Sequence, residues 1–421
     1  MARLERIHYE PFNASLEELG VLRWAKTGKK AIDRLPQIFW KSGRGWDEVN
    51  VWALMRATSG EIDFETIVRL MKHLYRYADF LETQKLDWRH FPVAKKERAL
   101  WLFRGYLIDQ RDKGLLAGST ATNCMLAVIS FYRFAQTQKL VRGKGPLWAD
   151  RTVVIPFHDM AGFERSILVL TSELSIPNKQ RPGVQLEDNL LPLRSEHMTE
   201  LLEYTAHNEE EELHYMLSTG FFTGARLGTV ITLTDNCLWK ALEDPLVPGI
   251  HRLKVGPGTG IDTKSDVSGE LLIPEAVLED LRTYATSTRR LLRAAKADPV
   301  DKHRLFLTRS GKPYSVPTVN RLVQELRIRA TKSGLLFMHD FKFHRSRATF
   351  GTWLVEILLN ARVPITGAIG FAREAMLHKD EAMTLRYIKF YQNSEVKKLA
   401  DKAFSEAFAG ISKRDWNKYS A

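Results

Sequence analysis

Three short stretches in the second half of the chain decide the fold. They are Thr223–Arg226 with the sequence TGAR, His344–Thr352 with the sequence HRSRATFGT, and Leu377–Tyr387 with the sequence LHKDEAMTLRY. Among their residues are the arginines Arg226 and Arg347, two histidines and a late tyrosine. Guanidinium groups bind phosphate oxygens in pairs, imidazoles move protons near neutral pH, and an activated phenol is a nucleophile. These groups suffice to cut a phosphodiester with a protein hydroxyl and keep the broken end attached.

The arginines and the tyrosine have roles that follow from charge. Attack by a tyrosine concentrates negative charge on the non-bridging phosphate oxygens, and the planar, always protonated guanidinium suits that charge better than lysine. We assign this role to Arg226 and Arg347, and the attack to Tyr387, although Tyr391 would serve equally well if spacing were ignored. Because the tyrosyl ester conserves the bond, and two arginines can replace the metal ions of other nucleases, we expect neither cofactor nor metal.

The remaining candidates move protons. His344 and His378 can donate a hydrogen bond to the phosphate or accept the phenol proton, and Lys264 can protonate the departing 5′-oxygen. His344 and Arg347 are three residues apart at a predicted helix start, so both project to one side. Lys254 is a weaker alternative to Lys264. A metal site with His339 is rejected, because five residues separate it from His344 and place the two on different helical faces.

Composition indicates a large globular protein with a polyanionic partner. The 421 residues exceed the size at which one core keeps growing, so two domains are expected. Lysine and arginine number 62 against 50 acidic residues, a net charge of +12, which favours nucleic acid or an acidic membrane surface. The N-terminus lacks a signal-like apolar segment and no run is apolar enough to span a membrane, so we expect a cytoplasmic protein with no membrane partner. The isolated Cys124 and Cys237 exclude a disulfide framework.

Hydrophobic periodicity predicts four regions. Residues 1–45 are an N-terminal extension of unknown role, 46–145 a helical domain, 146–190 a linker, and 191–421 a mostly helical second domain with short strands between 250 and 273. The predicted helices are 62–84, 95–113, 119–139, 195–206, 210–222, 274–296, 316–332, 345–360 and 394–409. The final helix, with Ser394 as its N-cap and Gly410 just beyond its end, docks either on its own domain or on a neighbouring protomer.

The helix at 62–84 has a basic face. Arg69, Lys72, His73 and Arg76 lie opposite its apolar stripe. Such a face is either simply solvated or, in a basic protein, a phosphate contact. We take Arg69, Lys72 and Arg76 as candidate DNA-binding residues.

The stretch Leu191–Phe390 resembles the catalytic domain of the tyrosine recombinase, or phage integrase, family. Thr223–Arg226 is similar to the first arginine box of that family, His344–Thr352 to its His-x-x-R box, and Leu377–Tyr387, with Thr384, to its closing segment. The helical segment 50–140 is similar to the family's core-binding domain. The resemblance implies six catalytic positions, and this sequence fills all of them: Arg226, Lys264, His344, Arg347, His378 and Tyr387.

The sequence departs from the family pattern at three places near these boxes. Thr229 replaces an acidic residue three positions after the first arginine, Ala348 replaces a histidine after the second arginine, and Met376 replaces a glycine before Leu377. None removes a reactive group. We therefore expect tuning of the site.

The resemblance implies a mainly α fold, a two-domain DNA clamp in which a helical core-binding domain joins a catalytic domain with a small antiparallel sheet. It implies a site-specific recombinase, integrase or transposase of a mobile genetic element that acts on double-stranded DNA. A homotetramer on two DNA sites, with accessory recombination proteins, is the expected assembly. The alternatives are a type IB topoisomerase, which shares the chemistry and works as a monomer, and a catalytically silent DNA-binding subunit of a recombination complex.

Overall fold

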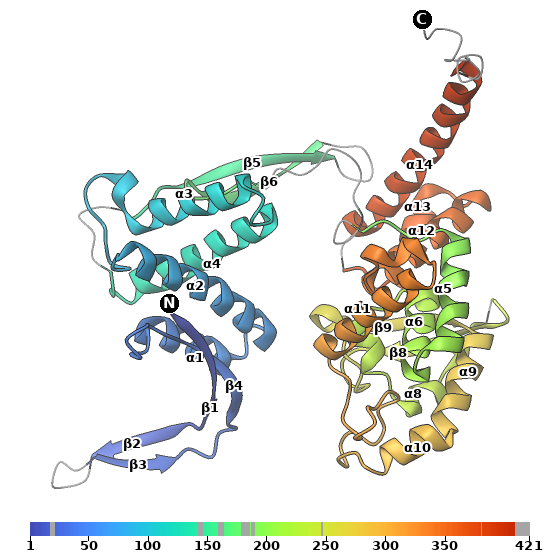
Figure 1. Ribbon diagram of the computed structural model, residues 1–421, viewed down its shortest axis with the longest axis horizontal. Helices are drawn as coiled ribbons and strands as arrows, with labels where there is room; N and C mark the ends of the chain where they lie inside the picture. The colour runs from blue at the N-terminus through green and yellow to red at the C-terminus, as the bar shows by residue number, and fades with distance from the viewer. Residues whose placement is uncertain are drawn as a thin grey trace, which may run out of the picture. The chain divides into compact units, whose positions relative to one another are not determined.

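The chain folds into two compact units, Met1–Arg181 and Pro182–Ala421 (Figure 1). The computed structural model describes residues 1–16, 22–141, 146–158, 164–177, 186, 190–245, 247–379 and 381–408. No helix within these ranges is long and apolar enough to cross a membrane.

The first unit combines helices with three two-stranded antiparallel sheets. Its strands and helices are β1 (Arg3–Tyr9), β2 (Phe12–Leu16), β3 (Leu22–Lys26), β4 (Ile32–Phe39), α1 (Asp47–Ser59), α2 (Phe64–Gln84), η1 (Lys95–Glu97), α3 (Ala99–Asp112), α4 (Gly118–Thr137), β5 (Asp150–His158) and β6 (Glu164–Ser172). The helices predicted at 62–84, 95–113 and 119–139 are confirmed, with ends that shift by a few residues.

The core of the first unit is aromatic. Trp46, Tyr77, Phe131 and Tyr132 are fully buried between α1, α2 and α4. The hydroxyls of Tyr77 and Tyr132 are 2.8 Å apart, and Tyr132 also donates to the carbonyl of Trp88. These bonds satisfy the polar ends of rings that would otherwise be costly to bury.

The N-terminal extension belongs to this core. Strand β4 packs on α1, where the Asn50 side chain receives a hydrogen bond from Ile38 N (2.7 Å) and donates one to Ile38 O (3.0 Å). Ala2, Leu35 and Ile38 are buried. Hydrophobic alternation over such short strands is weak, which explains why the sequence left this segment unassigned.

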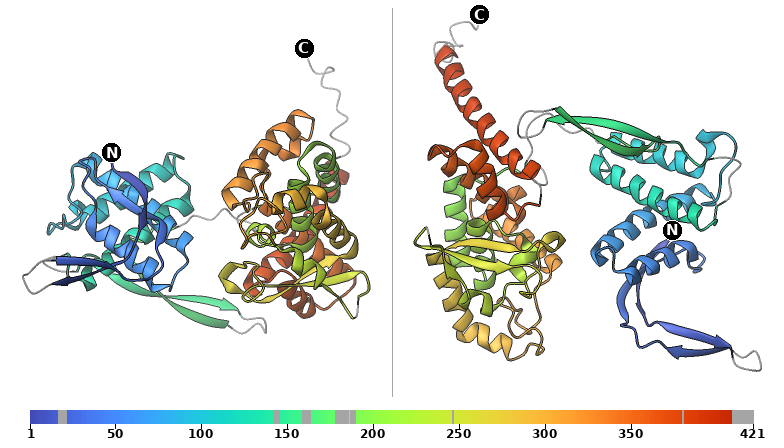
Figure 2. Two further views of the ribbon diagram at one scale, coloured as in Figure 1. Left: turned by 90° about the horizontal axis from the view of Figure 1, so that it is seen from below. Right: turned by 180° about the vertical axis from the view of Figure 1, so that it is seen from behind.

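Much of the predicted linker is also ordered in this unit. Strands β5 and β6 pair over nine residues each, and Leu147, Trp148, Leu174 and Ile176 at the base of this hairpin are buried in the core of the unit. The polar stretch at 178–185 lies outside the described residues. The segment predicted as a linker is thus ordered over 146–158 and 164–177. Figure 2 shows the ribbons β2–β3 and β5–β6 extending from the helices.

The second unit is mostly helical around a small antiparallel sheet of order β7-β8-β9. Its elements are α5 (Ser195–Asn208), α6 (Glu211–Thr223), α7 (Leu227–Ile231), α8 (Asp235–Trp239), β7 (Leu242–Glu243), β8 (Ile250–Val255), η3 (Lys264–Asp266), β9 (Gly269–Pro274), α9 (Glu275–Thr286), α10 (Thr288–Ala294), α11 (Val316–Lys332), η4 (Leu336–Asp340), α12 (His344–Asn360), α13 (Ile365–Ala375) and α14 (Glu381–Phe408).

Most predictions for this unit are confirmed, including the strands between 250 and 273 and the helix 316–332. The helix predicted at 274–296 is divided, because the Ser287 side chain accepts a hydrogen bond from Arg290 N and starts α10 anew. The predicted start of the last helix is wrong. Ser394 lies within α14, which begins at Glu381, and its hydroxyl bonds the Phe390 carbonyl one turn earlier. Gly410 lies outside the described residues.

Candidate active site

The TGAR stretch ends one helix and starts the next. Helix α6 ends at Thr223, and Gly224 adopts a left-handed conformation (φ 65°) as its C-cap. A Cβ on Gly224 would lie 2.3 Å from Phe350 Cδ1, so only glycine permits both the turn and the close approach of α12. Arg226 then has extended backbone as the N-cap of α7. The turn thus directs Arg226 away from α6.

Arg347 is fixed by backbone carbonyls. Its side chain is 2% exposed, Nη1 donates to the carbonyl of Gly224 (2.7 Å), and Nη2 donates to the carbonyl of Met376 (2.7 Å). A guanidinium presents its donors in a rigid fork, so two bonds to two different segments fix its plane. Sequence motifs did not identify these acceptors, since any residue type supplies a carbonyl.

Three cationic side chains from three elements share one small pocket. Arg226 at the start of α7, Lys264 in the loop between β8 and β9, and Arg347 on α12 all line it. The other lining residues are uncharged: Ala225, Thr229, Thr263, Val267, Leu271 and Leu377. Among the described lining residues the charge is therefore positive, which suits an anion with several oxygens.

The loop that carries Lys264 has a defined closure. Gly256 has φ 105°, and a Cβ there would lie 2.6 Å from the carbonyl oxygen of Val267 on the returning side of the loop. The Thr263 hydroxyl donates to that same carbonyl (2.7 Å). Lys264 itself is exposed, so the loop positions its backbone and leaves its side chain in solvent.

Tyr387 and His378 lie together beside this pocket. Their rings are 5.9 Å apart between centroids and nearly parallel, at 26°. His378 Nδ1 is 2.9 Å from Thr384 Oγ1, and both residues are buried. His378 also lines a neighbouring cavity, which shares Val267 and Leu377 with the cationic pocket. Thr384 was part of the family resemblance, but its bond to His378 was not predicted.

Gly351 connects Tyr387 to Arg347. It lies four residues after Arg347 on α12, and a Cβ on it would be 2.6 Å from both Tyr387 Cε1 and Met376 Cε. Met376 is also the residue whose carbonyl holds Arg347. The tyrosine ring therefore packs about one helical turn, or ~6 Å along the axis, from Arg347. A glycine four residues after the arginine is the sequence signal for this contact.

The comparisons with known proteins concern the fold. No protein-family model and no curated protein matches the sequence. Among solved structures, the Tn1549 transposon integrase in complex with transposon right end DNA matches with a TM-score of 0.50 and 16% identity, over 84% of this chain and 99% of that one. The chain has the fold of the tyrosine recombinases.

Two further structures give similar values. A Tn1549 integrase in complex with a circular intermediate DNA has a TM-score of 0.49 at 16% identity, over 81% of this chain and 94% of that one. A lambda integrase dimer bound to a COC′ core site has a TM-score of 0.48 at 14% identity, with the same coverage. The predicted fold class, mainly α with a helical first unit and a small antiparallel sheet in the second, is confirmed.

The departures from the pattern of the tyrosine recombinases fall on buried positions. Thr229 is buried and lines the cationic pocket where an acidic residue was expected, and Ala348 is buried in the apolar cluster around Tyr387. Met376 is buried, and its carbonyl serves Arg347 whatever its side chain. His344, half-buried, is the first residue of α12 and lies one turn before Arg347.

The competing tyrosine lies elsewhere in this tyrosine recombinase fold. Tyr391 donates to Oδ1 of Asn360, the last residue of α12 (3.0 Å), and lines a separate groove with Trp353. Thirteen residues of helix separate Asn360 from Arg347, or about 20 Å. The Tyr391 hydroxyl therefore lies at the far end of α12 from Arg347, whereas the Tyr387 ring packs near it.

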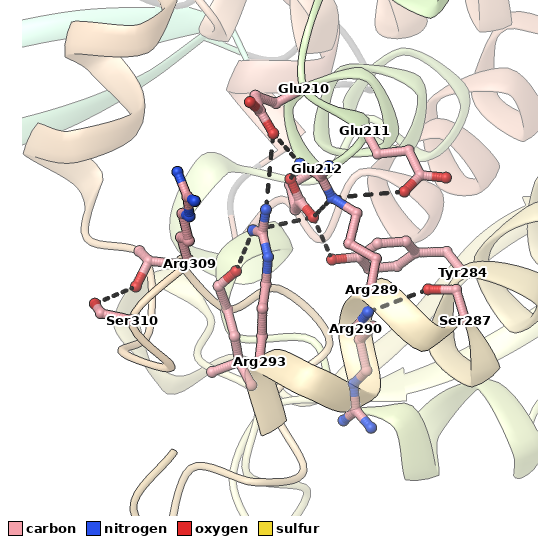
Figure 3. A network of polar contacts seen from close by, with 12 residues as sticks. Glu210, Glu211, Glu212, Tyr284, Ser287, Arg289, Arg290, Arg293, Arg309 and Ser310 are labelled. Atoms are coloured by element: carbon pink, nitrogen blue, oxygen red, sulfur yellow. Dashed lines mark hydrogen bonds and ion pairs between the residues drawn. The ribbon is translucent and has the colours of Figure 1, made fainter. Parts of the chain in front are cut away.

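A buried polar network anchors the other end of α6 (Figure 3). Glu212, near the start of α6, receives hydrogen bonds from Tyr284 (3.0 Å) and Arg289 (2.8 Å) and lies 3.0 Å from Arg293. Burial raises the pKa of Glu212, while Arg293 opposes that shift. Because α6 leads to Gly224 and Arg226, the network fixes the helix that presents them.

The basic face predicted on α2 is present in the first unit. Arg69, Lys72 and Arg76 are exposed on one side of the helix. His73 is partly buried among them, with Nδ1 3.0 Å from the Cys124 sulfur. Burial, and then the charges of Arg76 and Arg69, lower the pKa of His73.

Proposed function

We propose that this chain is a site-specific DNA recombinase, an integrase or transposase of a mobile genetic element. It would cleave and rejoin DNA strands through a covalent bond between Tyr387 and a DNA 3′-phosphate. One observation carries the proposal: Arg226, Lys264 and Arg347 line one pocket, and Tyr387 packs about one turn from Arg347.

In the first step the Tyr387 oxygen attacks the phosphorus and the bond to the 5′-oxygen breaks. Arg226 and Arg347 hold the non-bridging oxygens, where charge accumulates. Since the carbonyls of Gly224 and Met376 already orient Arg347, little reorganisation is needed during the reaction. The reverse attack by a 5′-hydroxyl restores the phosphodiester and frees the tyrosine, so rejoining consumes no ATP.

Two protons must move in each step. The phenol proton leaves as the Tyr387 oxygen bonds to phosphorus, and His378, whose ring stacks beside that of Tyr387, accepts it. The departing 5′-oxygen gains a proton from Lys264, whose exposed side chain can reach it. His344, at the start of α12, donates a hydrogen bond to a phosphate oxygen.

Tyr387 is fully buried, with 0% of its surface exposed, so attack requires a change at the start of α14. Leu377, between α13 and α14, has a positive φ of 51°, which a branched residue rarely adopts. We propose that the segment around Leu377 moves when DNA binds and brings the phenol to the cationic pocket.

Double-stranded DNA is the proposed partner, and the basic face of α2 is its proposed contact in the first unit. Phosphate contacts release counterions, so removing them lowers the salt dependence of binding. Replacing Arg69, Lys72 and Arg76 together by glutamine should lower the slope of log affinity against log salt by about three. An unchanged slope would mean that this face is merely solvated.

Recombination exchanges strands between two duplexes, so we propose a homotetramer on paired sites, assisted by accessory proteins in the bacterial cytoplasm. The Tn1549 integrase was solved in complex with transposon right end DNA, which supports a mobile-element substrate.

The test traps the covalent intermediate. Purified protein is incubated with nicked duplexes of randomised sequence, whose short cleaved fragment diffuses away, and the DNA attached to protein is sequenced. We expect an adduct with one shared sequence that forms in Tyr391→Phe and not in Tyr387→Phe. Adducts without any sequence preference, together with relaxation of any supercoiled plasmid, would indicate a topoisomerase. No adduct at all would indicate a silent DNA-binding subunit.

A further inference from the structure

The apolar cluster around Tyr387 includes a residue from outside the three helices that form it. Helices α12, α13 and α14 pack against one another, and Tyr387 is buried among their apolar side chains (Figure 1). Among the described residues, the other buried members of this cluster all lie between 348 and 388, whereas Leu186 comes from far earlier in the chain. Leu186 is 2% exposed. It therefore belongs to the packing that buries the proposed nucleophile.

Leu186 lies in the connection between the two units. The first unit ends at Arg181, and the second begins at Pro182. Ile176 is 1% exposed in the core of the first unit, and Leu186 follows it by ten residues. Ten residues span at most about 36 Å, even when fully extended. The connection is short enough to transmit a displacement of the first unit to Leu186.

The chain that follows Leu186 is fixed to α12 by hydrogen bonds. Leu193 N donates to Thr349 Oγ1 (2.8 Å), and Arg345 Nε donates to the Leu191 carbonyl (3.0 Å). Both bonds depend on direction as well as distance, so they hold this part of the chain in one place. A pull from the first unit therefore acts on Leu186 before it acts on α12, the helix that carries the buried arginine of the cationic pocket.

The contact that Leu186 makes with the cluster is apolar. Apolar packing is non-directional, so it can be released and formed again without a specific geometry. When a buried leucine side chain leaves its site, the groups that lined it lose their contacts. Withdrawal of Leu186 would therefore loosen the packing around Tyr387.

We propose that Leu186 is a positioning residue that keeps Tyr387 buried until both units have bound DNA. In the free protein Leu186 completes the cluster and holds the phenol away from the cationic pocket. When the first unit binds DNA, the connection withdraws Leu186, and the segment around Leu377 then brings Tyr387 to the phosphate. The purpose of this release, which restricts cleavage to fully bound sites, rests on the proposed function.

The first experiment measures the solvent access of Tyr387 in the full chain without DNA. Hydroxyl-radical footprinting, followed by peptide mass spectrometry, gives the oxidation rate of each tyrosine side chain. Tyr106, 37% exposed, is the accessible reference, and Tyr284, 1% exposed, is the buried reference. In the wild type Tyr387 should react as slowly as Tyr284.

Leu186→Ala should raise the oxidation rate of Tyr387 by about tenfold, the order expected when a buried leucine loses its packing, and should leave Tyr284 protected. Leu326→Ala is the matched control, because Leu326 is 0% exposed in a second apolar cluster of the same unit. It should leave Tyr387 protected. If Tyr284 also reacted in Leu186→Ala, the unit would have unfolded, and Leu186→Val, which leaves a smaller cavity, takes its place. No increase at Tyr387, or an equal increase in the control, would overturn the proposal.

The second experiment keeps Leu186 and loosens the connection. An insertion of about six glycine and serine residues between Asn178 and Lys179 lengthens it by up to about 20 Å. At saturating nicked duplex this variant should form the covalent adduct about tenfold more slowly, because the state with Tyr387 released is less populated. Adding Leu186→Ala to the insertion should restore the rate. An insertion that leaves the rate unchanged, or that Leu186→Ala does not rescue, would overturn the proposal.

The two experiments separate this inference from the proposed function, because the footprint needs neither DNA nor cleavage. Suppose that Tyr387 is protected in the wild type and exposed in Leu186→Ala, and that no DNA yields an adduct. This result would refute the recombinase and leave the role of Leu186 in burying Tyr387 standing. Adduct formation by a chain whose Tyr387 is oxidised equally with and without Leu186 would do the reverse.

Discussion

Two cationic residues of the same pocket, Arg347 and Lys264, differ in how they are held. Arg347 on α12 is buried and held by two carbonyls, whereas Lys264, on the loop between β8 and β9, is exposed. A group that stabilises charge gains from being fixed before the reaction, because no reorganisation is then needed. A proton donor must follow a departing oxygen and gains from reach. The difference between Arg347 and Lys264 fits the roles proposed for these two residues.

The largest effect on cleavage should come from changing the buried Arg347. Arg347→Lys keeps the charge but cannot donate to both Gly224 and Met376 while binding phosphate. We expect cleavage to fall by about 10³-fold, and the free energy of unfolding to fall by about 1–3 kcal/mol because a buried carbonyl loses its donor. Single-turnover cleavage and urea unfolding measure the two effects.

Arg345→Lys is the matched control for Arg347→Lys. Arg345 lies two residues earlier on α12 and binds Asp340 and the Leu191 carbonyl near the surface. It should retain nearly full activity. If both variants lost cleavage equally, the fixed geometry of Arg347 would not explain its role.

Changing the exposed Lys264 should affect cleavage with little effect on stability. Lys264→Ala should slow cleavage by about 10²-fold, the usual range for loss of a general acid, with little change in unfolding. In a substrate whose 5′-bridging oxygen is replaced by sulfur, the departing thiolate needs no proton. This substrate should restore the cleavage rate of Lys264→Ala. Lys254→Ala, on strand β8, serves as the control. Failure of the sulfur substrate to rescue Lys264→Ala would remove Lys264 from the role of acid.

A smaller effect should follow from the orientation of His378. Thr384→Val removes the hydroxyl that lies 2.9 Å from Nδ1 and should slow cleavage by about tenfold, the equivalent of one hydrogen bond. The pH dependence of the rate should also shift, since the tautomer of His378 is no longer fixed. Thr384→Ser should behave like the wild type. A purely structural Thr384 would leave the pH profile unchanged in Thr384→Val.

How much of this site could be predicted depends on which groups act. Side chains with distinctive chemistry, such as Arg226, Arg347 and Tyr387, could be proposed from the sequence because their spacing is itself a signal. The acceptors that fix Arg347 were missed because a backbone carbonyl has no sequence signature. Met376 was noted only as a departure from glycine, although its carbonyl matters more than its side chain.

The fold shows the same limit. Helices with a strong apolar stripe, such as 316–332, were predicted to the residue, whereas the ribbons β2–β3 and β5–β6 were not assigned as ribbons. Strand β2 has only five residues, and β5 and β6 are apolar at consecutive positions, so none shows a long alternation of apolar and polar residues. The predicted start of α14 was too late, because Ser394 is a residue type that often caps helices but here lies inside the helix.

The smallest expected effect is a pH dependence of stability caused by His73 on α2. His73 is partly buried beside exposed Arg69 and Arg76, and its pKa is lowered by burial first. The unfolded chain therefore binds a proton below about pH 6.5 that the folded chain does not. The free energy of unfolding should fall as pH decreases below that value, and His73→Gln should flatten the slope. An unaltered slope in thermal unfolding at several pH values would contradict this.

The central claim is that Tyr387 is the residue joined to DNA. After trapping on a nicked duplex, nuclease and protease digestion leaves a peptide that carries a nucleotide, and mass spectrometry locates the attachment. We expect a 3′-linked nucleotide on Tyr387 and none on Tyr391. A nucleotide attached at any other residue, or to the 5′ end of the broken strand, would contradict the account.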